Sequence, residues 1–512
     1  MINNNNKKIN LNKLKEPELM FGFEQKLEDP RDGLSLFGPF EKSRPLGIQW
    51  GIIGTKDGFN RFKNWVKKIQ GPISNIPPDI ARPPFPGFEA VFGIPWEIEP
   101  VLRLEVTEEE IRKNLYLSDK HQRVYNTVEI FSDKIEKSLR EEDKTPNIWF
   151  VIIPDEIYKY CRPLSSVEAE LKIEPEYKMS IEYAKSIRSE TKSLFEIDNK
   201  AAIPYEYEVN FHNQLKARLL EKRVVIQIIR ESTIAYEDFK TSSGRAIRDL
   251  DKLQSAIAWN ISTTAFYKAG GMPWKVGTIR DGVCYIGLVF KQNPIGGPKS
   301  ACCAAQMFLD SGDGVVFRGA VGNFHDPVSK TYHLNFESAQ KLVEKAINAY
   351  KEKKGSLPKE LFIHGKTSFS YEEWEGFQKG GVSSINIVCV RIKDAKDLKF
   401  YRKGKYPVVR GIAYIIDEKF AYLCTKGFIP RLQTSTGLEV PRPLEITICR
   451  GEADIEVVLK DIMMLTKLNY NACIFGDGWP VTLKFADAVG EILTAGPIQK
   501  LDVPPLSFKF YI

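Results

Sequence analysis

Three basic side chains and an amide stand at spacings that suit the binding of an anion. His212 and Lys216 are four residues apart in a segment with a helical pattern, so both side chains project from one face of that helix. Gln227 lies in the apolar segment that follows, and Lys268 closes the next helical segment. Charged and amide donors gathered in this way at a parallel sheet are what a terminal phosphate requires.

The same residues also have simpler explanations. A basic pair four residues apart is usually a solvated helix face. A lysine such as Lys268 at a helix C-terminus is favoured by the helix dipole alone. On the residues alone, these explanations and a phosphate pocket all remain open.

An alternation of strands and helices positions these residues. The apolar run 148–153, which Pro154 ends, is typical of a buried strand. Residues 211–222 have a helical pattern and lead to a second apolar run, 224–229; a further helix, 253–268, ends before Gly270-Gly271. Strand, helix, strand and helix in this order predict a parallel, Rossmann-like layer.

Beyond residue 273 the pattern changes to strands in series. Strands are predicted over 283–290, 302–309 and 315–321, the last two forming a hairpin, then a helix over 339–353, a strand over 360–364 and a helix over 372–379. The sequence therefore predicts an α/β protein in three parts: a disordered tail over 1–17, a Rossmann-like domain over 18–270 and a mixed-sheet domain over 271–512. The Pro-rich stretch 70–100 is expected to be an ordered connector anchored by Phe85, Phe88, Phe92 and Trp96.

Composition narrows the classes of protein. Of 512 residues, 43% are hydrophobic, which is enough for a sizeable core, and the longest uncharged apolar run is too short to cross a bilayer. The eight cysteines include no C-x-x-C pair, so reduced thiols in a cytoplasmic, soluble protein are expected. The chain has 73 basic and 66 acidic residues, a net charge of +7, which permits a polyanionic partner without requiring one.

Several strings together resemble one family. They are residues 29–34 (DPRDGL) with 37–39 (FGP), 212–218 (HNQLKAR) and 465–471 (LTKLNYN) followed by Pro480. With these strings the chain resembles short prokaryotic Argonautes, which have a MID domain and a PIWI domain. Residues 284–323 resemble the subgroup whose partner is a TIR–APAZ protein. The resemblance implies a Rossmann-like MID domain followed by an RNase H-like PIWI domain. It also implies that His212, Lys216, Gln227 and Lys268 bind the 5′-phosphate of a guide.

The resemblance also implies where a nuclease would hold its metals. Active members use four side chains, chiefly carboxylates, because two metal ions need several carboxylates to hold them. Val289 and Lys366 stand at two of these positions, and only Asp487 matches the last. One carboxylate does not hold two metal ions, so a binding surface without nuclease activity is expected.

The end of the chain, 508–512 (FKFYI), alternates apolar and polar residues and predicts a strand or extended tail. A terminal strand tied into the sheet is one explanation. In the family, an apolar C-terminus tucks between the domains and its carboxylate helps to hold a divalent ion at the guide phosphate. The resemblance therefore implies Ile512 as a ligand of Mg²⁺, beside phosphate oxygens and water.

The resemblance implies the following function. A guide RNA would recognise a complementary single-stranded DNA target. A TIR–APAZ partner, bound as a heterodimer, would assemble into higher oligomers and hydrolyse NAD in defence against plasmids or phage. Two alternatives remain open: a Sir2–APAZ partner, and an active endonuclease built on carboxylates such as Asp281, Asp310 and Asp313.

Overall fold

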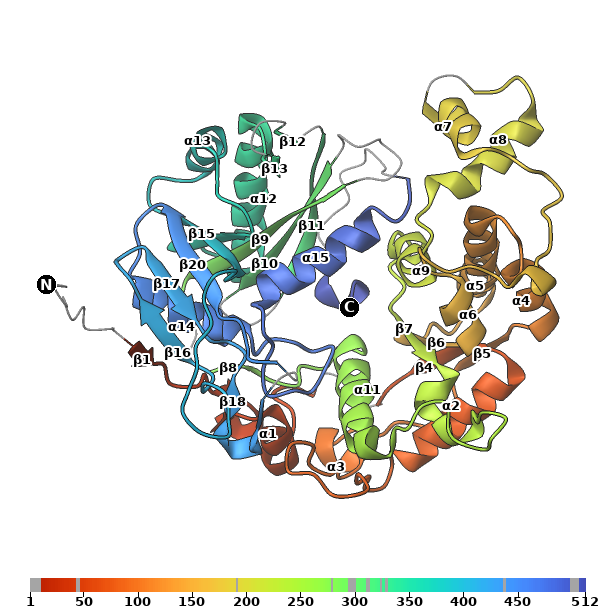
Figure 1. Cartoon of the computed structure of the whole chain (residues 1–512), viewed down its shortest axis with the longest axis horizontal. Helices are drawn as coiled ribbons and strands as arrows, with labels where there is room; N and C mark the ends of the chain where they lie inside the picture. The colour runs from red at the N-terminus through yellow and green to blue at the C-terminus, as the bar shows by residue number, and fades with distance from the viewer. Residues whose placement is uncertain are drawn as a thin grey trace, which may run out of the picture.

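The protein has two α/β halves with a helix between them (Figure 1). The computed structural model describes residues 11–42, 47–189, 192–277, 280–292, 301–309, 314–322, 325–326, 330–435, 439–497 and 506–512. In Figure 1 a four-stranded sheet lies on the right and a ten-stranded sheet on the left, with α11 (Gln254–Lys268) between them. No helix within the described ranges is long and apolar enough to cross a membrane.

The four-stranded sheet is parallel throughout, as the sequence predicted. Its order is β5-β4-β6-β7, with bounds Leu102–Glu105, Trp50–Gly54, Ile148–Ile153 and Ile226–Arg230. All six residues of β6 are buried, because helices cover both faces of such a sheet. The helices of this half are α2 (Lys56–Lys68), α4 (Glu108–Leu115), α5 (Lys120–Glu141), α6 (Asp155–Tyr160), α9 (Phe211–Leu220) and α10 (Glu231–Ile234), with α7 (Ile181–Ser189) and α8 (Glu196–Ala202) packed in a separate small cluster.

The ten-stranded sheet is mixed. Its order is β1 (Leu11–Lys13), β16 (Ile412–Ile415), β17 (Phe420–Leu423), β20 (Leu444–Arg450), β15 (Asn386–Asp394), β14 (Glu360–Gly365), β9 (Val283–Gln292), β10 (Ala301–Leu309), β11 (Gly314–Gly322) and β21 (Leu506–Ser507). Strand β14 runs parallel to both β9 and β15, and the other neighbours are antiparallel. The predicted pairing of β10 with β11 is confirmed; residues 311–313 of its turn lie outside the described ranges.

The side chains of β9 alternate between two helical layers. Ile286 and Leu288 pack with α12 (Phe336–Lys354) and α13 (Tyr371–Gly380). Tyr285 and Val289 point to the other face, in the cluster that contains α14 (Ile455–Leu465) and α15 (Val481–Leu493). The sheet is therefore covered on both sides, and α15 lies on the face that carries Val289.

The beginning of the chain differs from the expected tail. Residues 11–13 form β1, which pairs with β16, and Leu14 is buried. The Glu16 carboxylate lies 3.0 Å from the Arg410 guanidinium and 2.9 Å from the Lys467 ammonium, both almost fully buried. Two buried cations need an anion, and this carboxylate ties residues 11–16 to the second half. The prediction of disorder was therefore wrong for residues 11–17.

The segment that contains β2 (Leu19–Met20) and β3 (Lys26–Leu27) belongs to the second half, although the predicted boundary assigns it to the first domain. Strand β2 pairs with β3 and with β8 (Lys275–Val276), which follows the first half in sequence. From residue 11 on, the chain thus starts in the second half, passes through the four-stranded sheet and returns. A boundary drawn only along the sequence misses this arrangement because the pairing is long-range.

The connector predicted over 70–100 is ordered, and its four aromatic anchors are all buried. Phe85 packs edge-on against Trp259 with ring centroids 5.0 Å apart, and Phe92 stacks on Phe266 at 4.6 Å. Phe92 ends α3 (Phe88–Phe92), and both partners lie on α11. The connector therefore fixes α11 beside the first sheet.

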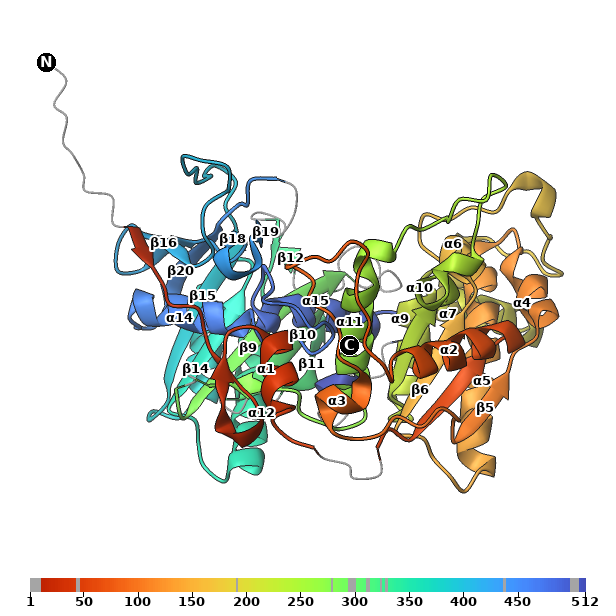
Figure 2. The ribbon, with the colours of Figure 1, turned by 90° about the horizontal axis from the view of Figure 1, so that it is seen from below.

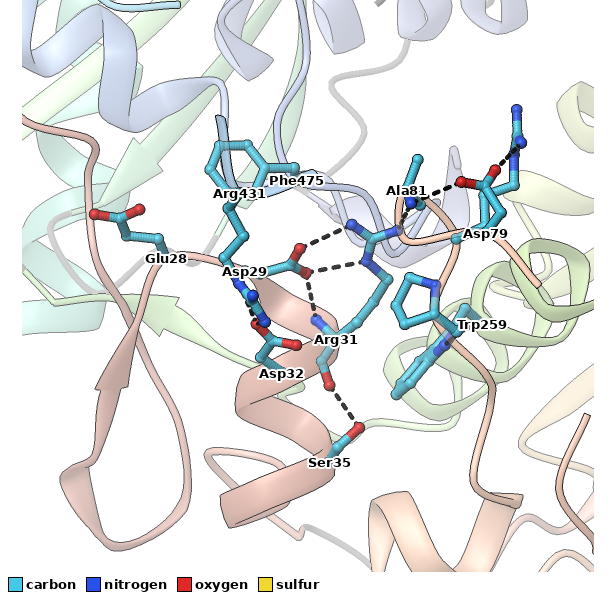
Figure 3. Close-up of polar contacts among 12 residues, drawn as sticks. Glu28, Asp29, Arg31, Asp32, Ser35, Asp79, Ala81, Trp259, Arg431 and Phe475 are labelled. Atoms are coloured by element: carbon cyan, nitrogen blue, oxygen red, sulfur yellow. Dashed lines mark hydrogen bonds and ion pairs between the residues drawn. The ribbon is translucent and has the colours of Figure 1, made fainter. Parts of the chain in front are cut away.

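The motif at residues 29–34 begins helix α1 (Pro30–Phe37) and is structural (Figure 3). Asp29 caps the helix by accepting from the Arg31 backbone N–H at 2.9 Å, and it also binds the Arg31 guanidinium at 2.8 and 3.0 Å. Arg31 donates in turn to the carbonyl oxygen of Ala81 at 2.8 Å. Burial alone would raise the pKa of Asp29, but the bonds to Arg31 outweigh it and the pKa is lowered. The pair joins α1 to the connector.

Candidate functional site

The four residues predicted to bind phosphate come together beside α11. Lys268 donates to the Gln227 side-chain oxygen and to the Ile226 carbonyl oxygen, both at 2.8 Å. Burial, together with the charge of Lys216, lowers the pKa values of both His212 and Lys268, so these three side chains lie within electrostatic reach of one another. The fold therefore gathers residues from α9, β7 and α11, as the sequence predicted.

Two of these residues are buried ammonium groups. Lys216 is 4% exposed and Lys268 is 1% exposed. Within the described part of the chain, neither has a carboxylate side chain as an ion-pair partner; they bond to neutral oxygens instead. Burial lowers the pKa of Lys216 to about 7, and burial together with Lys216 lowers the pKa of Lys268 well below its usual value. Because an anion would stabilise the charged forms of both lysines, this pair is a candidate site for an anion.

His212 lies at the mouth of this pocket. Its side chain has exposed surface, and Nδ1 is 3.0 Å from the side-chain oxygen of Asn213. The surrounding protein removes part of its hydration and Lys216 lies close, so its pKa is lowered. The imidazole is therefore neutral at pH 7 and offers a hydrogen bond rather than a third positive charge.

The chain end completes the pocket, although residues 508–510 are not the predicted strand or extended tail. Residues 506–507 form β21, and residues 508–510 turn in a 3-10 helix. Phe508 is buried against Phe485 of α15 with ring centroids 4.1 Å apart, which turns the backbone and breaks the expected alternation. Tyr511 and Ile512 are buried, and the Tyr511 carbonyl oxygen accepts from Lys216 at 3.0 Å. In both views the C-terminus lies beside α11, between the halves (Figures 1 and 2).

The donors in the pocket suit Mg²⁺ only together with a phosphate. The Gln227 oxygen and the Tyr511 carbonyl oxygen already accept from lysines, so the terminal carboxylate of Ile512 is the anionic oxygen group that the chain end brings here. Mg²⁺ commonly takes one or two carboxylates and completes its shell with phosphate oxygens and water. Ile512 as a metal ligand therefore fits this site and stays a prediction.

Next to the pocket is a cavity of about 390 Å³, lined by residues of both halves, among them Ala217, Val316 and Tyr511. Arg218 lies over the rings of Tyr125 and Tyr207, 4.0 and 4.7 Å from their centroids. The sequence reasoning did not single out Arg218. Its place two residues after Lys216 turns it to the other side of α9, toward this cavity.

The second predicted site lies where α15 crosses β9. Gly287 permits this crossing, because a Cβ there would lie 1.9 Å from the Thr482 carbonyl oxygen. Farther along α15, Asp487 lies between two lysines: its carboxylate is 2.8 Å from the Lys291 ammonium and 3.1 Å from that of Lys366. Burial would raise the pKa of Asp487, but the two lysines outweigh it and the pKa is lowered.

Lys291 is the residue that sequence reasoning missed here. It follows Val289 by two positions on β9, so it projects from the same face of the sheet. This two-residue alternation along the strand could have identified Lys291 from the sequence. Its ammonium also lies 3.1 Å from the Glu491 carboxylate, one turn after Asp487. Val289 itself is 5% exposed and packs in the core under α15. Across the described residues, no group of three or more His, Cys, Asp or Glu side chains is placed to hold a metal ion.

The remaining candidates are accounted for locally. His364 is buried, with Nδ1 3.0 Å from the Thr482 hydroxyl, so it is a core residue with a hydrogen-bond partner. Arg442 is exposed and lies outside any helix or strand. Asp281 of the alternative endonuclease is 92% exposed and lies 4.0 Å from Lys359. Asp310 and Asp313 lie outside the described ranges.

Comparisons with known proteins agree with this arrangement. No family model matches the chain. A curated Argonaute from Aquifex aeolicus is 22% identical over 300 residues, which are 56% of this chain and 36% of that protein. The structure of Clostridium butyricum Argonaute, bound to a guide DNA and a 19-mer target DNA, aligns with a TM-score of 0.65 at 14% identity and covers 98% of this chain and 55% of that one.

Two further solved structures have the same architecture. Drosophila Piwi aligns with a TM-score of 0.57 at 12% identity, and A. aeolicus Argonaute with externally bound siRNA with 0.53 at 13%; each covers 98% of this chain and 56% of the other. The chain thus spans little more than half the length of these solved structures. The similarities support the Argonaute/PIWI family and confirm the predicted fold class, a Rossmann-like MID domain with an RNase H-like PIWI domain.

Proposed function

We propose that this chain binds a small 5′-phosphorylated guide RNA, uses it to recognise complementary single-stranded DNA, and does not itself cut the target. The pair of buried ammonium groups at Lys216 and Lys268 carries the proposal. Both lack a carboxylate partner among the described residues, and a phosphate would supply the missing negative charge. The similarity to Argonautes, one of them solved with a guide and a target, supports a nucleic acid as the source of that phosphate.

Each pocket residue would have a distinct part. Lys216 and Lys268 would bind phosphate oxygens, which restores their charged forms. Gln227, which now accepts from Lys268 at 2.8 Å, would orient that ammonium, and His212 at the mouth would donate from a neutral ring. When bound, Mg²⁺ would offset the repulsion between the guide phosphate and the carboxylate of Ile512.

A lack of cleavage is proposed from the second site. Two-metal hydrolysis needs carboxylates that hold two cations close together. Here Val289 fills one expected ligand position with an apolar side chain, and Lys366 brings a positive charge to another. Asp487 is neutralised by Lys291 and Lys366, which would compete with any divalent ion for its oxygens.

The cellular role is proposed from the resemblance to short prokaryotic Argonautes. The chain would form a heterodimer with a TIR–APAZ protein, and target binding would drive assembly of several heterodimers. NAD hydrolysis by the partner would then protect a prokaryotic cell against plasmids or phage. A Sir2–APAZ partner is the alternative, and the open reading frame next to this gene distinguishes the two.

A binding experiment tests the core of the proposal. The purified chain is titrated with one RNA sequence carrying either a 5′-phosphate or a 5′-hydroxyl, and each loaded complex is then titrated with complementary or scrambled single-stranded DNA. We expect the phosphorylated guide to bind at least about tenfold more tightly, because it adds charge-assisted hydrogen bonds. Equal affinity for both guides, or equal binding of both DNAs, would contradict the proposal.

A further inference from the structure

Lys291 and Lys366, the two lysines that bind Asp487, can do more than compete with a metal ion as proposed above. Lys366 leaves β14 just past the paired residues Gly365 and Leu288, so it emerges beside Val289. Lys291 comes from β9 on the same face, and the two ammonium groups bind opposite oxygens of one carboxylate, at 3.1 and 2.8 Å. Two positive charges therefore flank the Asp487 carboxylate on this face of the sheet, and Glu491 is a second carboxylate beside Lys291 at 3.1 Å.

Both ammonium groups retain donors for a further ligand. An ammonium has three N–H donors. Within the described structure Lys366 has one carboxylate partner and its side chain is 42% exposed, whereas Lys291 has two and is 24% exposed. The ring of Trp479 lies 5.7 Å from the Lys366 ammonium and forms an apolar wall beside it. Lys366 therefore presents free, oriented donors to solvent.

In two-metal sites, carboxylates hold cations, and the cations bind a phosphate of the nucleic acid. A lysine ammonium binds phosphate as a point charge without a metal, but it does not supply the Lewis acidity that cleavage needs. We infer that Lys366 and Lys291, held by Asp487, bind one backbone phosphate of the target strand directly and without a divalent ion. This inference rests on the proposed function, because it requires a guide-paired target to lie over this face of the second half.

A scan of single neutral phosphates tests the inference. Target DNAs, each with one methylphosphonate at a different position, are bound to the guide-loaded protein, and the affinities are compared with that for unmodified DNA. For the wild-type protein we expect one position, or two adjacent positions, at which the loss is on the order of tenfold. In Lys366→Met this position-specific loss of affinity, the dip in the scan, should disappear. The salt dependence of target binding should also fall by about one phosphate contact. Lys366→Arg should restore both the dip and the salt dependence.

Two controls separate this site from general effects of charge and metal. Lys341 is exposed on α12, which covers the opposite face of the sheet, so Lys341→Met should keep the dip. Chelator added after guide loading should leave the dip in place. Guide-dependent binding with a flat scan, a dip that persists in Lys366→Met, or a dip that chelator abolishes would each overturn this inference alone. Absence of guide-dependent target binding by the wild-type protein would overturn the proposed function with it.

Discussion

The ammonium of Lys216 donates to the backbone carbonyl oxygen of Tyr511 at 3.0 Å and so joins α9 of the first half to the end of the chain. Both residues are buried, and the two are 295 positions apart. The bond holds the end of the chain at Lys216, which, like Lys268, lacks a carboxylate side chain as partner within the described structure. The pocket therefore needs both halves of the molecule to be complete.

Replacing the two buried lysines should abolish loading of a phosphorylated guide. In Lys216→Glu combined with Lys268→Glu, two phosphate partners become repulsive charges, and each lost charge-assisted bond costs about 1.5–3 kcal/mol. Affinity is measured by titration with a labelled 5′-phosphate RNA at fixed salt, and retention of the fold by circular dichroism. Lys137→Glu, an exposed change on α5, is the matched control. Unchanged affinity in the double variant would show that the pocket is wrongly assigned.

Guide loading should weaken as pH rises above 7. The pKa of buried Lys216 is lowered to about 7, so at higher pH the free protein must take up a proton in order to bind a phosphate. Affinity for a 5′-phosphate guide should fall between pH 7 and 9 by up to about tenfold per unit, a window in which the phosphate itself is already a dianion. The measurement is the dissociation constant across this range, with a 5′-hydroxyl guide as reference. A profile that Lys216→Met leaves unchanged would contradict this assignment.

The stability of the free protein should have the opposite pH dependence. A lysine in the unfolded chain has a pKa near 10.4, so between pH 7 and about 10 the unfolded state binds more protons than the folded state does. The contribution of Lys216 to the free energy of unfolding therefore increases with pH in this window. Urea unfolding at several pH values measures it, and the difference between wild type and Lys216→Met isolates it. A difference that is constant or decreases with pH would exclude a lowered pKa for Lys216.

The free end of the chain should matter for phosphorylated guides in particular. A short Gly-Ser extension after Ile512 moves the terminal carboxylate away from Lys216, and chelator removes the ion that would bridge it to phosphate. Both treatments should weaken binding of a 5′-phosphate guide and affect a 5′-hydroxyl guide much less. If the extended protein loads phosphorylated guides normally and chelator has no effect, Ile512 is only a packed end and not a metal ligand.

The target should remain intact in the loaded complex. With guide, complementary DNA or RNA and Mg²⁺ or Mn²⁺, no guide-directed product should form, because Val289 and Lys366 stand where the resemblance to Argonautes implies metal ligands. Denaturing gels over long incubations provide the measurement. A cut at a fixed distance from the guide end that Asp487→Ala abolishes would instead establish an active endonuclease.

Removing the Glu16 carboxylate should destabilise the whole protein. Glu16→Ala leaves buried Arg410 and Lys467 without this anion, and breaking a buried pair in this way costs on the order of 3–5 kcal/mol. Urea unfolding measures the loss. The nearby Glu18, which pairs with the largely exposed Lys15, is the control: Glu18→Ala should cost less than about 1 kcal/mol. Similar losses for the two variants would contradict a specific role for Glu16.

The sequence by itself determined the local elements and part of each site. The apolar run 148–153 specified β6, and helical spacing placed His212 and Lys216 on one face of α9. The sequence also shows a valine, Val289, and a lysine, Lys366, at positions where the resemblance implies metal ligands. These features depend on residue type and on short-range periodicity, which a single sequence contains.

Only the tertiary structure decided which distant residues meet. It paired residues 11–13 with β16, turned residues 508–510 into a 3-10 helix because Phe508 packs on Phe485, and brought Lys291 to Asp487 across nearly two hundred positions. Periodicity along a strand tells which face a side chain occupies, but not which helix covers that face. That choice follows from packing the whole core at once, so no local pattern contains it.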